Sequence, residues 1–482
     1  WTNVGEFGYG RELRNDKIDV AIDNHSSPLK VREDEVYKEL DYAVGSKDDR
    51  ATHGTEVMGI AAGNGNSLMG TQGVAPRADI IFVQLPPNAI KATPGTLSNN
   101  IVDGAHYVFK RARELNKKAA VVNISYGGYS GPHDGTSGWE MALDEFLNIE
   151  DRAVVVSAGN AFEADCHAVG TLQPGQESRL RWIVRPGDST ANDLEIWYNG
   201  DASLSVWLAP PDGSPELGPY AFGPLAKLKL APSGTIVGAI EHFQHDQTNG
   251  DNSVTVALWP TAMAIPPAVN ALALAPPGRW VVRLRNTGGN AAEFHAWIHR
   301  DDVAKRSGPR QQSRFVREDA YPGYTMCDFA TGQLTISAGG FNAATDEVCS
   351  YSSCGPTRGS ANNPARQKPD FCAPAEELAT GGGVLTTGSR RAAPRRMNGT
   401  SAAAPHIAGI VALLFDHRRN YQKKHLTAAE LRAALTAQTG GNQLVPDRRQ
   451  AADQGIAVKQ SDVWADLIGA GKISCLKSLD NL

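Results

Sequence analysis

Three short segments hold residue types that together could carry out nucleophilic catalysis. Asp23 ends the apolar run at 20–22, His53 begins a stretch of small and apolar residues, and Ser401 precedes three alanines. A serine hydroxyl is a weak nucleophile near neutral pH, so it needs a base to take its proton and a carboxylate to orient that base. The chain order Asp, His, Ser is one of the orders in which such triads occur. The three segments together therefore predict a catalytic triad.

Each segment taken alone has a simpler interpretation. An aspartate after a strand commonly caps a turn, and a single histidine near a helix start is commonly structural. A serine before an alanine-rich helix is most simply an N-cap. Only the combination of the three, in this order, indicates chemistry.

Segments that are apolar throughout alternate with helical patterns in the two outer regions of the chain. Such alternation is typical of a parallel sheet covered by helices on both faces. The expected strands are 17–22, 79–85, 119–124, 153–157, 333–338 and 369–374, and the expected helices are 53–63, 98–116, 137–149, 401–417 and 428–437, the last with Thr427 as N-cap. Asp23 would then lie at the carboxyl end of a buried strand, where α/β sheets place their ligands.

The central region, 167–303, has no helical periodicity and contains strand-like stretches divided by turn signals such as Asn199-Gly200 and Pro277-Gly278. Six of the nine tryptophans fall in it, which favours strands packing aromatic side chains into a core. We expect about seven or eight antiparallel strands in a jelly-roll-like β-sandwich. The predicted fold is thus α/β with an inserted domain. Residues 1–166 form the first part of the catalytic domain, 167–303 the insert, and 304–482 a connector and the second part.

The composition of the 482-residue chain excludes several classes of protein. A net charge of −5 argues against an electrostatic nucleic-acid binder, and no apolar run is long enough to span a membrane. Six cysteines are too few for a scaffold built on disulfides. Cys349, Cys354 and Cys372 lie close enough in sequence for one disulfide, and burial as free thiols is the alternative.

Several motifs follow one another along the chain in a characteristic order. They are Val-Ala-Ile-Asp (20–23), His-Gly-Thr-x-Val-x-Gly-Ile-Ala (53–61), Gly-Val-Ala-Pro-x-Ala (73–78), Asn-Ile-Ser-Tyr-Gly-Gly (123–128), Ser-Ala-Gly-Asn (157–160), Lys-Pro-Asp-x-x-Ala-Pro (368–374) and Gly-Thr-Ser-Ala-Ala-Ala-Pro (399–405). This set resembles the subtilisin-like serine proteases, or subtilases. The resemblance implies a doubly wound, mostly parallel sheet, with Asp23, His53 and Ser401 as the triad and Asn160 as the oxyanion-hole residue.

The resemblance also implies how a substrate would bind. The implied substrate-binding residues are Ser125, Tyr126, Gly127 and Gly128, which would pair with an extended peptide, and Ala158 and Gly159, which would help to wall the pocket for the side chain before the scissile bond. A peptide bound as an added strand must be unfolded or lie in a loop.

The implied activity is that of a serine endopeptidase acting through an acyl-enzyme on Ser401. Two alternatives use the same scaffold: a transpeptidase or macrocyclase, in which an amine replaces water, and a non-catalytic binding protein, against which the complete triad argues. The chemistry requires no cofactor. Structural calcium is common in the family, but no compact Asp-rich loop is evident and no metal ligand can be named. Implied partners are protein or peptide substrates and a propeptide or protein inhibitor, at a secreted or periplasmic location.

Some features depart from the family pattern or lie outside it. Asn24-His25 replaces the usual Ser/Thr-Gly, and we expect His25 to be a turn residue rather than a modulator; Asp19 is the fallback for Asp23. Charged residues flank the site at Asp48, Asp49, Arg390, Arg391, Arg395 and Arg396, and are interpreted as solvated loops or, alternatively, as selectors of substrate charge. His242 and His245 are more typical of surface residues than of a metal pair. The insert is expected to stabilise the fold or shape the cleft rather than bind glycan.

Overall fold

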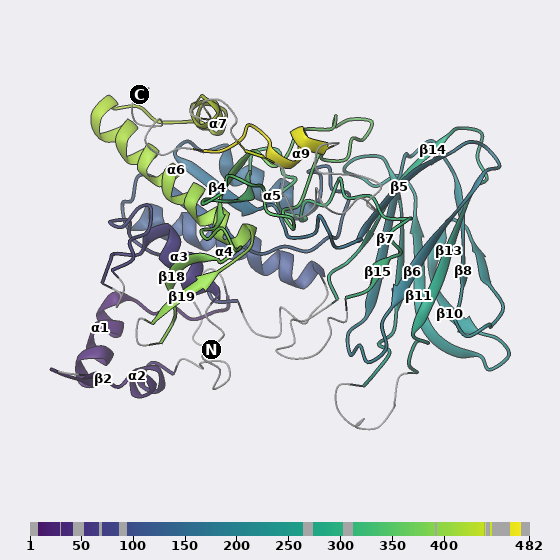
Figure 1. Ribbon diagram of the computed structural model, residues 1–482, viewed down its shortest axis with the longest axis horizontal. Coiled ribbons are helices and arrows are strands. Elements are labelled where there is room, and N and C mark those ends of the chain that lie inside the picture. Colours follow the sequence, from purple (N-terminus) through teal and green to yellow (C-terminus); the bar gives the residue numbers. More distant parts are fainter. Residues whose placement is uncertain are drawn as a thin grey trace.

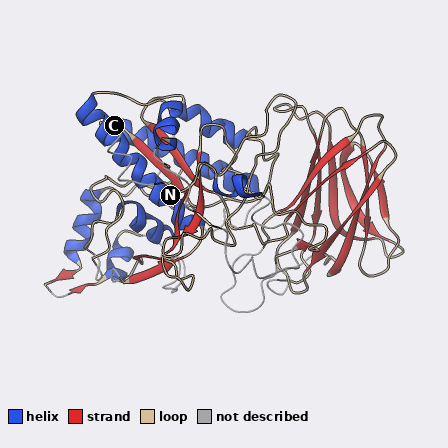
Figure 2. Ribbon diagram, turned by 45° about the horizontal axis from the view of Figure 1, so that its top comes forward, coloured by secondary structure: helices blue, strands red, loops and turns tan. Residues whose placement is uncertain are grey.

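The computed structural model describes residues 8–28, 30–41, 53–66, 70–85, 94–263, 273–301, 312–390, 393–437, 439, 444–445 and 463–473. Figure 1 shows two parts side by side. The α/β part on the left comes from the two ends of the chain, and the part made of strands on the right comes from its middle. Figure 2 shows the same division, with helices gathered in the first part and long strands in the second.

A four-stranded parallel sheet forms the centre of the α/β part. Its order is β17-β16-β4-β3. The strands are β3 (Ala120–Ile124), β4 (Arg152–Ser157), β16 (Ile336–Asn342) and β17 (Phe371–Glu376). Every residue of β16 is buried, as expected for a strand whose two faces are both covered.

Helices cover both faces of this sheet. On β4, Val155 packs in a cluster with Ile407 of α6 (Thr400–Gln422), whereas Val154 packs in another cluster with Leu143 of α5 (Gly138–Leu147) and Phe109 of α4 (Pro94–Glu114). Neighbouring residues of a strand point to opposite faces, so one strand contributes to both layers. The predicted parallel sheet with helices on both faces is confirmed.

Shorter elements complete the α/β part. They are α3 (His53–Ala62), the hairpin of β18 (Val384–Thr387) and β19 (Pro394–Met397), α7 (Ala428–Thr436) and α9 (Trp464–Ile468). Thr427 caps α7 as predicted, and its hydroxyl accepts from the Glu430 amide in a capping box.

Two predicted strands are wrong. Residues 17–22 lie in helix α1 (Asn15–Asn24), and residues 79–85 contain no strand. Helix α1 packs against α2 (Glu33–Glu39), beside the small hairpin of β1 (Ser26–Ser27) and β2 (Lys30–Val31). Because 17–22 has no neighbouring strand, local helical hydrogen bonds satisfy its backbone groups in place of a sheet ladder. Asp23 therefore lies near the end of an exposed helix rather than at the edge of the sheet.

The middle of the chain forms two antiparallel sheets. Their orders are β10-β11-β12-β7-β14-β5 and β15-β6-β13-β8-β9. The strands are β5 (His167–Leu172), β6 (Glu177–Val184), β7 (Asn192–Tyr198), β8 (Leu204–Ala209), β9 (Leu217–Tyr220), β10 (Gly223–Leu230), β11 (Thr235–Phe243), β12 (Asn252–Leu258), β13 (Gly278–Asn286), β14 (Ala292–Ile298) and β15 (Arg314–Phe315). The insert therefore has more strands than the seven or eight expected from the sequence. The jelly-roll class stays a prediction.

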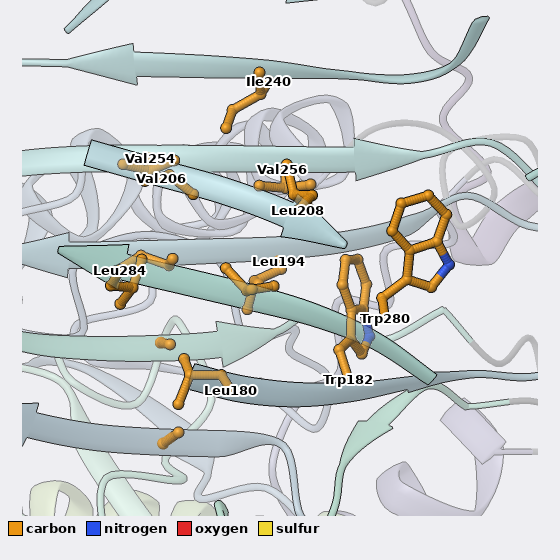
Figure 3. Packing of buried hydrophobic residues seen from close by; sticks show 14 of the residues in the cluster. Leu180, Trp182, Leu194, Val206, Leu208, Ile240, Val254, Val256, Trp280 and Leu284 are labelled. Carbon is orange, nitrogen blue, oxygen red and sulfur yellow. The ribbon is translucent and has the colours of Figure 1, made fainter. Parts of the chain in front are cut away.

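Inward side chains from both sheets meet in one core. Figure 3 shows Trp182 and Trp280 of one sheet near Leu194 of the other, and all three are completely buried. Trp182 and Trp280 thus pack inside the insert, which leaves these two side chains no surface on which to bind a glycan.

The cysteine and helix expectations can be checked over the described residues. Five buried cysteines form no disulfide, so the alternative of buried thiols is the one observed; they are Cys166, Cys327, Cys349, Cys354 and Cys372. No helix in the described ranges is long and apolar enough to cross a membrane.

Candidate active site

Ser401 lies in the first turn of α6, where a proline shapes its surroundings. Pro405 has no N–H to donate to the Ser401 carbonyl four residues earlier, so that carbonyl is left without its helical partner. The Ser125 hydroxyl donates to it instead, over 2.9 Å. The Ser401 hydroxyl in turn donates to the Ser125 carbonyl over 3.3 Å. This exchange fixes the predicted nucleophile to the end of β3.

Asn160 lies against the start of the same helix. Its Oδ1 accepts from the Thr400 amide over 2.9 Å, and the Thr400 hydroxyl bonds to the carbonyl of Gly159 over 3.1 Å. Gly399, at φ 107°, allows the chain to turn here, and a Cβ on it would lie 3.1 Å from Asn160 Nδ2. Asn160 is exposed, and because its Oδ1 is engaged, Nδ2 is the end of the carboxamide that remains to donate. The structure thus places Asn160 beside the residue that precedes Ser401.

His53 begins helix α3, which runs alongside α6 in the same direction. Val57 and Ala402 share one buried cluster, and further along a Cβ on Gly409 would lie 3.1 Å from the Ala61 carbonyl. The first turns of both helices therefore lie at the same end, which brings His53 and Ser401 to one side of the molecule. No hydrogen bond joins the two side chains among the described residues.

The electrostatic surroundings of His53 favour its neutral form. Desolvation by the protein around the ring lowers the pKa of His53, although the residue keeps an exposed surface. The Glu56 carboxylate opposes this shift, and the positive charge of Arg300 adds to it. A neutral imidazole is the form that can accept a proton from a serine hydroxyl.

The structure does not bring Asp23 into this arrangement. Asp23 is exposed on α1, and within the described residues its carboxylate makes no hydrogen bond or ion pair. Asp19, the fallback, is exposed on the same helix. His25 caps α1 and pairs with Glu39 of α2 over 2.7 Å, so it is a turn residue, as predicted.

The substrate-binding residues expected from the sequence surround a segment that sequence analysis missed. Asp328 is buried, and its carboxylate accepts from the Gly128 amide over 2.9 Å while its own amide donates to the Gly128 carbonyl over 3.0 Å. Burial raises the pKa of Asp328 to about 6. A Cβ on Gly127 would lie 2.5 Å from Cys327 Sγ, so only glycine fits there.

The segment 327–328 also contacts Ala158 and Gly159, the other predicted substrate-binding residues. The Cys327 amide donates to the Ala158 carbonyl over 2.8 Å, and the Ala158 amide donates to Ala338 of β16 over 2.9 Å. A Cβ on Gly159 would lie 2.7 Å from Ser353 Oγ. Residues 125–128 and 158–159 are thus joined through 327–328. Nothing in the sequence marks Asp328, because it falls just after the polar stretch interpreted as a connector.

The insert packs directly against the chain that follows Tyr126. Glu195 of β7 accepts from the Gly131 amide over 2.9 Å and pairs with His299 over 2.8 Å. The rings of His133 and Trp297 stack with their centroids 4.2 Å apart. Further along, Arg358 pairs with Asp251 of the insert over 2.6 Å. These contacts place the insert against the segment that follows the predicted substrate-binding residues 125–128.

The remaining candidates contribute little to the site. Asp48, Asp49 and Arg391 lie outside the described residues. Arg390 pairs with Asp34 over 2.9 Å and Arg396 with Glu377 over 3.2 Å, which partly neutralises the expected basic cluster.

The proposed metal ligands do not form a site. The expected surface position is wrong for His242, which is buried with its Nε2 2.6 Å from the Tyr198 hydroxyl. Within the described ranges, no group of three or more histidine, cysteine or acidic side chains could hold a metal ion. Structural calcium stays a prediction.

Comparisons with known proteins agree with this geometry. A family model of the subtilases matches residues 15–185 and 302–460. Thermitase from Thermoactinomyces vulgaris is 33% identical over 109 residues, which are 23% of this chain and 34% of thermitase, so the match spans about a third of that relative. The structure of the Clostridium perfringens CspB protease has a TM-score of 0.72 at 21% identity, covering 97% of this chain and 86% of that one. The likeness to CspB shows the fold.

Proposed function

The chain belongs to the subtilase family, and we propose that it is a serine endopeptidase that forms an acyl-enzyme on Ser401. The observation that carries this proposal is the joining of Asn160 to the start of α6. Through the Thr400 amide, one hydrogen bond of 2.9 Å ties the predicted oxyanion donor to the chain segment that bears the predicted nucleophile. A purely structural serine at a helix start would not need a carboxamide bonded to the residue before it.

The proposed reaction uses groups at the two helix starts. Neutral His53 takes the Ser401 proton as Oγ attacks the substrate carbonyl, and the peptide amine leaves with that proton. The developing oxyanion accepts from Asn160 Nδ2 and from a backbone N–H at the start of α6, where the helix dipole favours negative charge. Water, activated by His53, then hydrolyses the ester.

The proposed role of Asp23 requires a change in the chain around it. Apolar side chains near Asp23 and within 79–85 are exposed: Val20 by 56%, Ile80 by 50% and Phe82 by 48%. Strand β3 is the last strand of the four-stranded sheet. We propose that 17–22 and 79–85 become strands of this sheet in the catalytically competent form. That change would bury these side chains and carry Asp23 to the sheet edge near His53.

The proposed substrate is an unfolded or loop segment of a protein, bound along 125–128 as an added strand. Ala158 and Gly159 complete the wall of the pocket for the side chain before the scissile bond. We propose a propeptide or protein inhibitor as a second partner, a jelly-roll class for the insert, a secreted or periplasmic location, and no cofactor for the chemistry.

Hydrolysis of a defined peptide, followed by mass spectrometry, tests the proposed function. The wild-type protein should release two fragments, and Ser401→Ala should lose about a million-fold in kcat, a loss measured within the subtilisin family. Ser205→Ala, a serine on β8 of the insert, is the matched control and should keep wild-type turnover. Joined or cyclised products would assign the protein to the transpeptidases. An absence of any product would favour a binding protein.

A further inference from the structure

Arg300 of the insert stands beside the segment that would bind substrate. It lies two residues after the end of β14, and its guanidinium carbon lies 5.9 Å from the centre of the Tyr126 ring. The side chain is exposed, and it forms no ion pair with any of the described residues. An exposed cation over an aromatic ring, without a carboxylate partner, is available to bind an anion.

The position of Arg300 is fixed from both sides. His299, the residue before it, is buried and pairs with Glu195, which also accepts from the Gly131 amide of the α/β part. Asp301, the residue after it, is buried and accepts from the Ser313 amide over 3.1 Å. Because both neighbours are anchored, the backbone at Arg300 cannot swing away from the cleft.

The charge of Arg300 reaches both the predicted base and the predicted substrate edge. Burial lowers the pKa of His53, and Arg300 adds to that shift. Burial raises the pKa of Tyr126, and there Arg300 opposes the shift while Asp328 adds to it. Asp328, the carboxylate that faces this region from the other side, is buried and accepts hydrogen bonds from Gly128 and Ser130. It is therefore occupied within the wall rather than paired with Arg300.

We propose that Arg300 makes the enzyme select substrates with an aspartate or glutamate side chain upstream of the scissile bond. This inference rests on the proposed peptidase function, since it assigns the upstream edge to 125–128. The insert then contributes directly to specificity, because it supplies Arg300 as the cation beside Tyr126. Arg390 and Arg396, by contrast, are each paired with a carboxylate.

Peptide binding to an inactive background tests this selection without depending on turnover. The probes are acetylated, amidated fluorescent peptides that differ only at one upstream position, which holds Glu, Gln or Lys, scanned over the four positions before the cut. With Ser401→Ala protein, the Glu peptide should bind about tenfold tighter than the Gln peptide at one position, which corresponds to about 1.4 kcal/mol. Adding Arg300→Glu should reverse the order in favour of Lys, and Arg300→Lys should keep the preference for Glu.

Arg279→Glu is the matched control, because it makes the same charge change at an exposed residue of β13, in the other sheet of the insert. It should leave the Glu preference unchanged. The proposal is overturned if Arg300→Glu and Arg279→Glu have the same profile, or if no upstream position distinguishes Glu from Gln. Wild-type protein that discriminates the peptides but cleaves none would contradict the peptidase function and leave the Arg300 selection standing.

Discussion

The two halves of the candidate site are built differently. Ser401 and Asn160 lie where a buried strand and a buried helix meet. Ser401 is bonded to Ser125 at the end of β3, and Asn160 and Gly159 are bonded to Thr400, the residue before Ser401. Asp23 lies on a surface helix in the lower left of Figure 1, with exposed apolar neighbours and no polar contact in the described part of the chain.

This difference shows what holds each predicted residue in place. The predicted nucleophile and the predicted oxyanion donor are positioned by packing that also forms the core, so their geometry does not depend on substrate binding. The carboxylate is positioned only by local helical hydrogen bonds, and it can join the site only if its segment gains a partner strand. The variants below distinguish the part of the site that is already in place, around Ser401 and Asn160, from the part around Asp23 that must still be assembled.

Asp23→Asn should have the largest effect of these variants. If the segment assembles as proposed, kcat should fall about ten-thousand-fold, the loss typical of a triad aspartate, because the imidazole loses its orienting carboxylate. Glu56→Gln is the matched control: this carboxylate acts on His53 in the present structure, and its loss should change kcat only a few-fold. The reverse order, with Glu56→Gln inactive and Asp23→Asn active, would show that Glu56 serves the base.

Asn160→Ala should lower kcat by about 100- to 1,000-fold, a figure measured within the subtilisin family, because the oxyanion loses one donor. KM should change little, since the donor acts mainly on the transition state. Asn148→Ala at the end of α5 serves as control for a lost carboxamide. A rise in KM with unchanged kcat would place Asn160 in substrate binding instead.

Acid should destabilise the interface between the insert and the α/β part, where His133 and His167 both lie against Trp297. Burial lowers the pKa of His133 to about 4 and that of His167 to about 3, so both are neutral when folded. The unfolded chain binds these protons first, so stability should fall as the pH drops from the ordinary histidine range near 6.5 towards 4. Each pKa unit between the two states corresponds to about 1.4 kcal/mol per group.

Urea unfolding at a series of pH values measures this loss. His133→Phe keeps the ring stacked on Trp297 but cannot be protonated, so its stability should fall less steeply with acid than that of the wild type. His417→Phe, on α6, should retain the wild-type slope. Equal slopes for wild type and His133→Phe would refute the idea that this histidine makes the interface acid-sensitive.

Ser125→Ala should have the smallest effect, because it removes one hydrogen bond to the Ser401 carbonyl and should lower the free energy of unfolding by about 1 kcal/mol. Pro405→Ala offers a direct control, since it restores an N–H that can reach the same carbonyl. In the Pro405→Ala background, Ser125→Ala should cost less than in the wild type. Additive effects in this double-mutant cycle would mean that the two residues do not share the carbonyl.

Much of the buried architecture could be predicted from the sequence. Strands such as 153–157 are apolar throughout and can be stable only between two covered faces, so the sheet and its helices followed from the pattern. Ser401 was predicted from its combination with Asp23 and His53, and Asn160 from the resemblance to the subtilases.

The rest depended on information that a local pattern does not carry. The local sequence at 17–22 is compatible with either a strand or a helix, and it does not reveal which segments pack beside it. The structure contains the helix. Asp328 and Arg300 act through contacts between distant segments, and neither lies in a recognisable motif. Asp328 can be recognised as part of the site only from the structure, which places it between 125–128 and 158–159.

Reaction with a fluorophosphonate probe, followed by mapping of the modified peptide, tests the central claim most directly. That claim is that Ser401 is an activated nucleophile held beside an oxyanion donor. The wild-type protein should gain a single adduct on Ser401, and Asn160→Ala should react more slowly, whereas Ser125→Ala should still react. An unmodified wild-type protein, or an adduct on any other serine, would contradict the account.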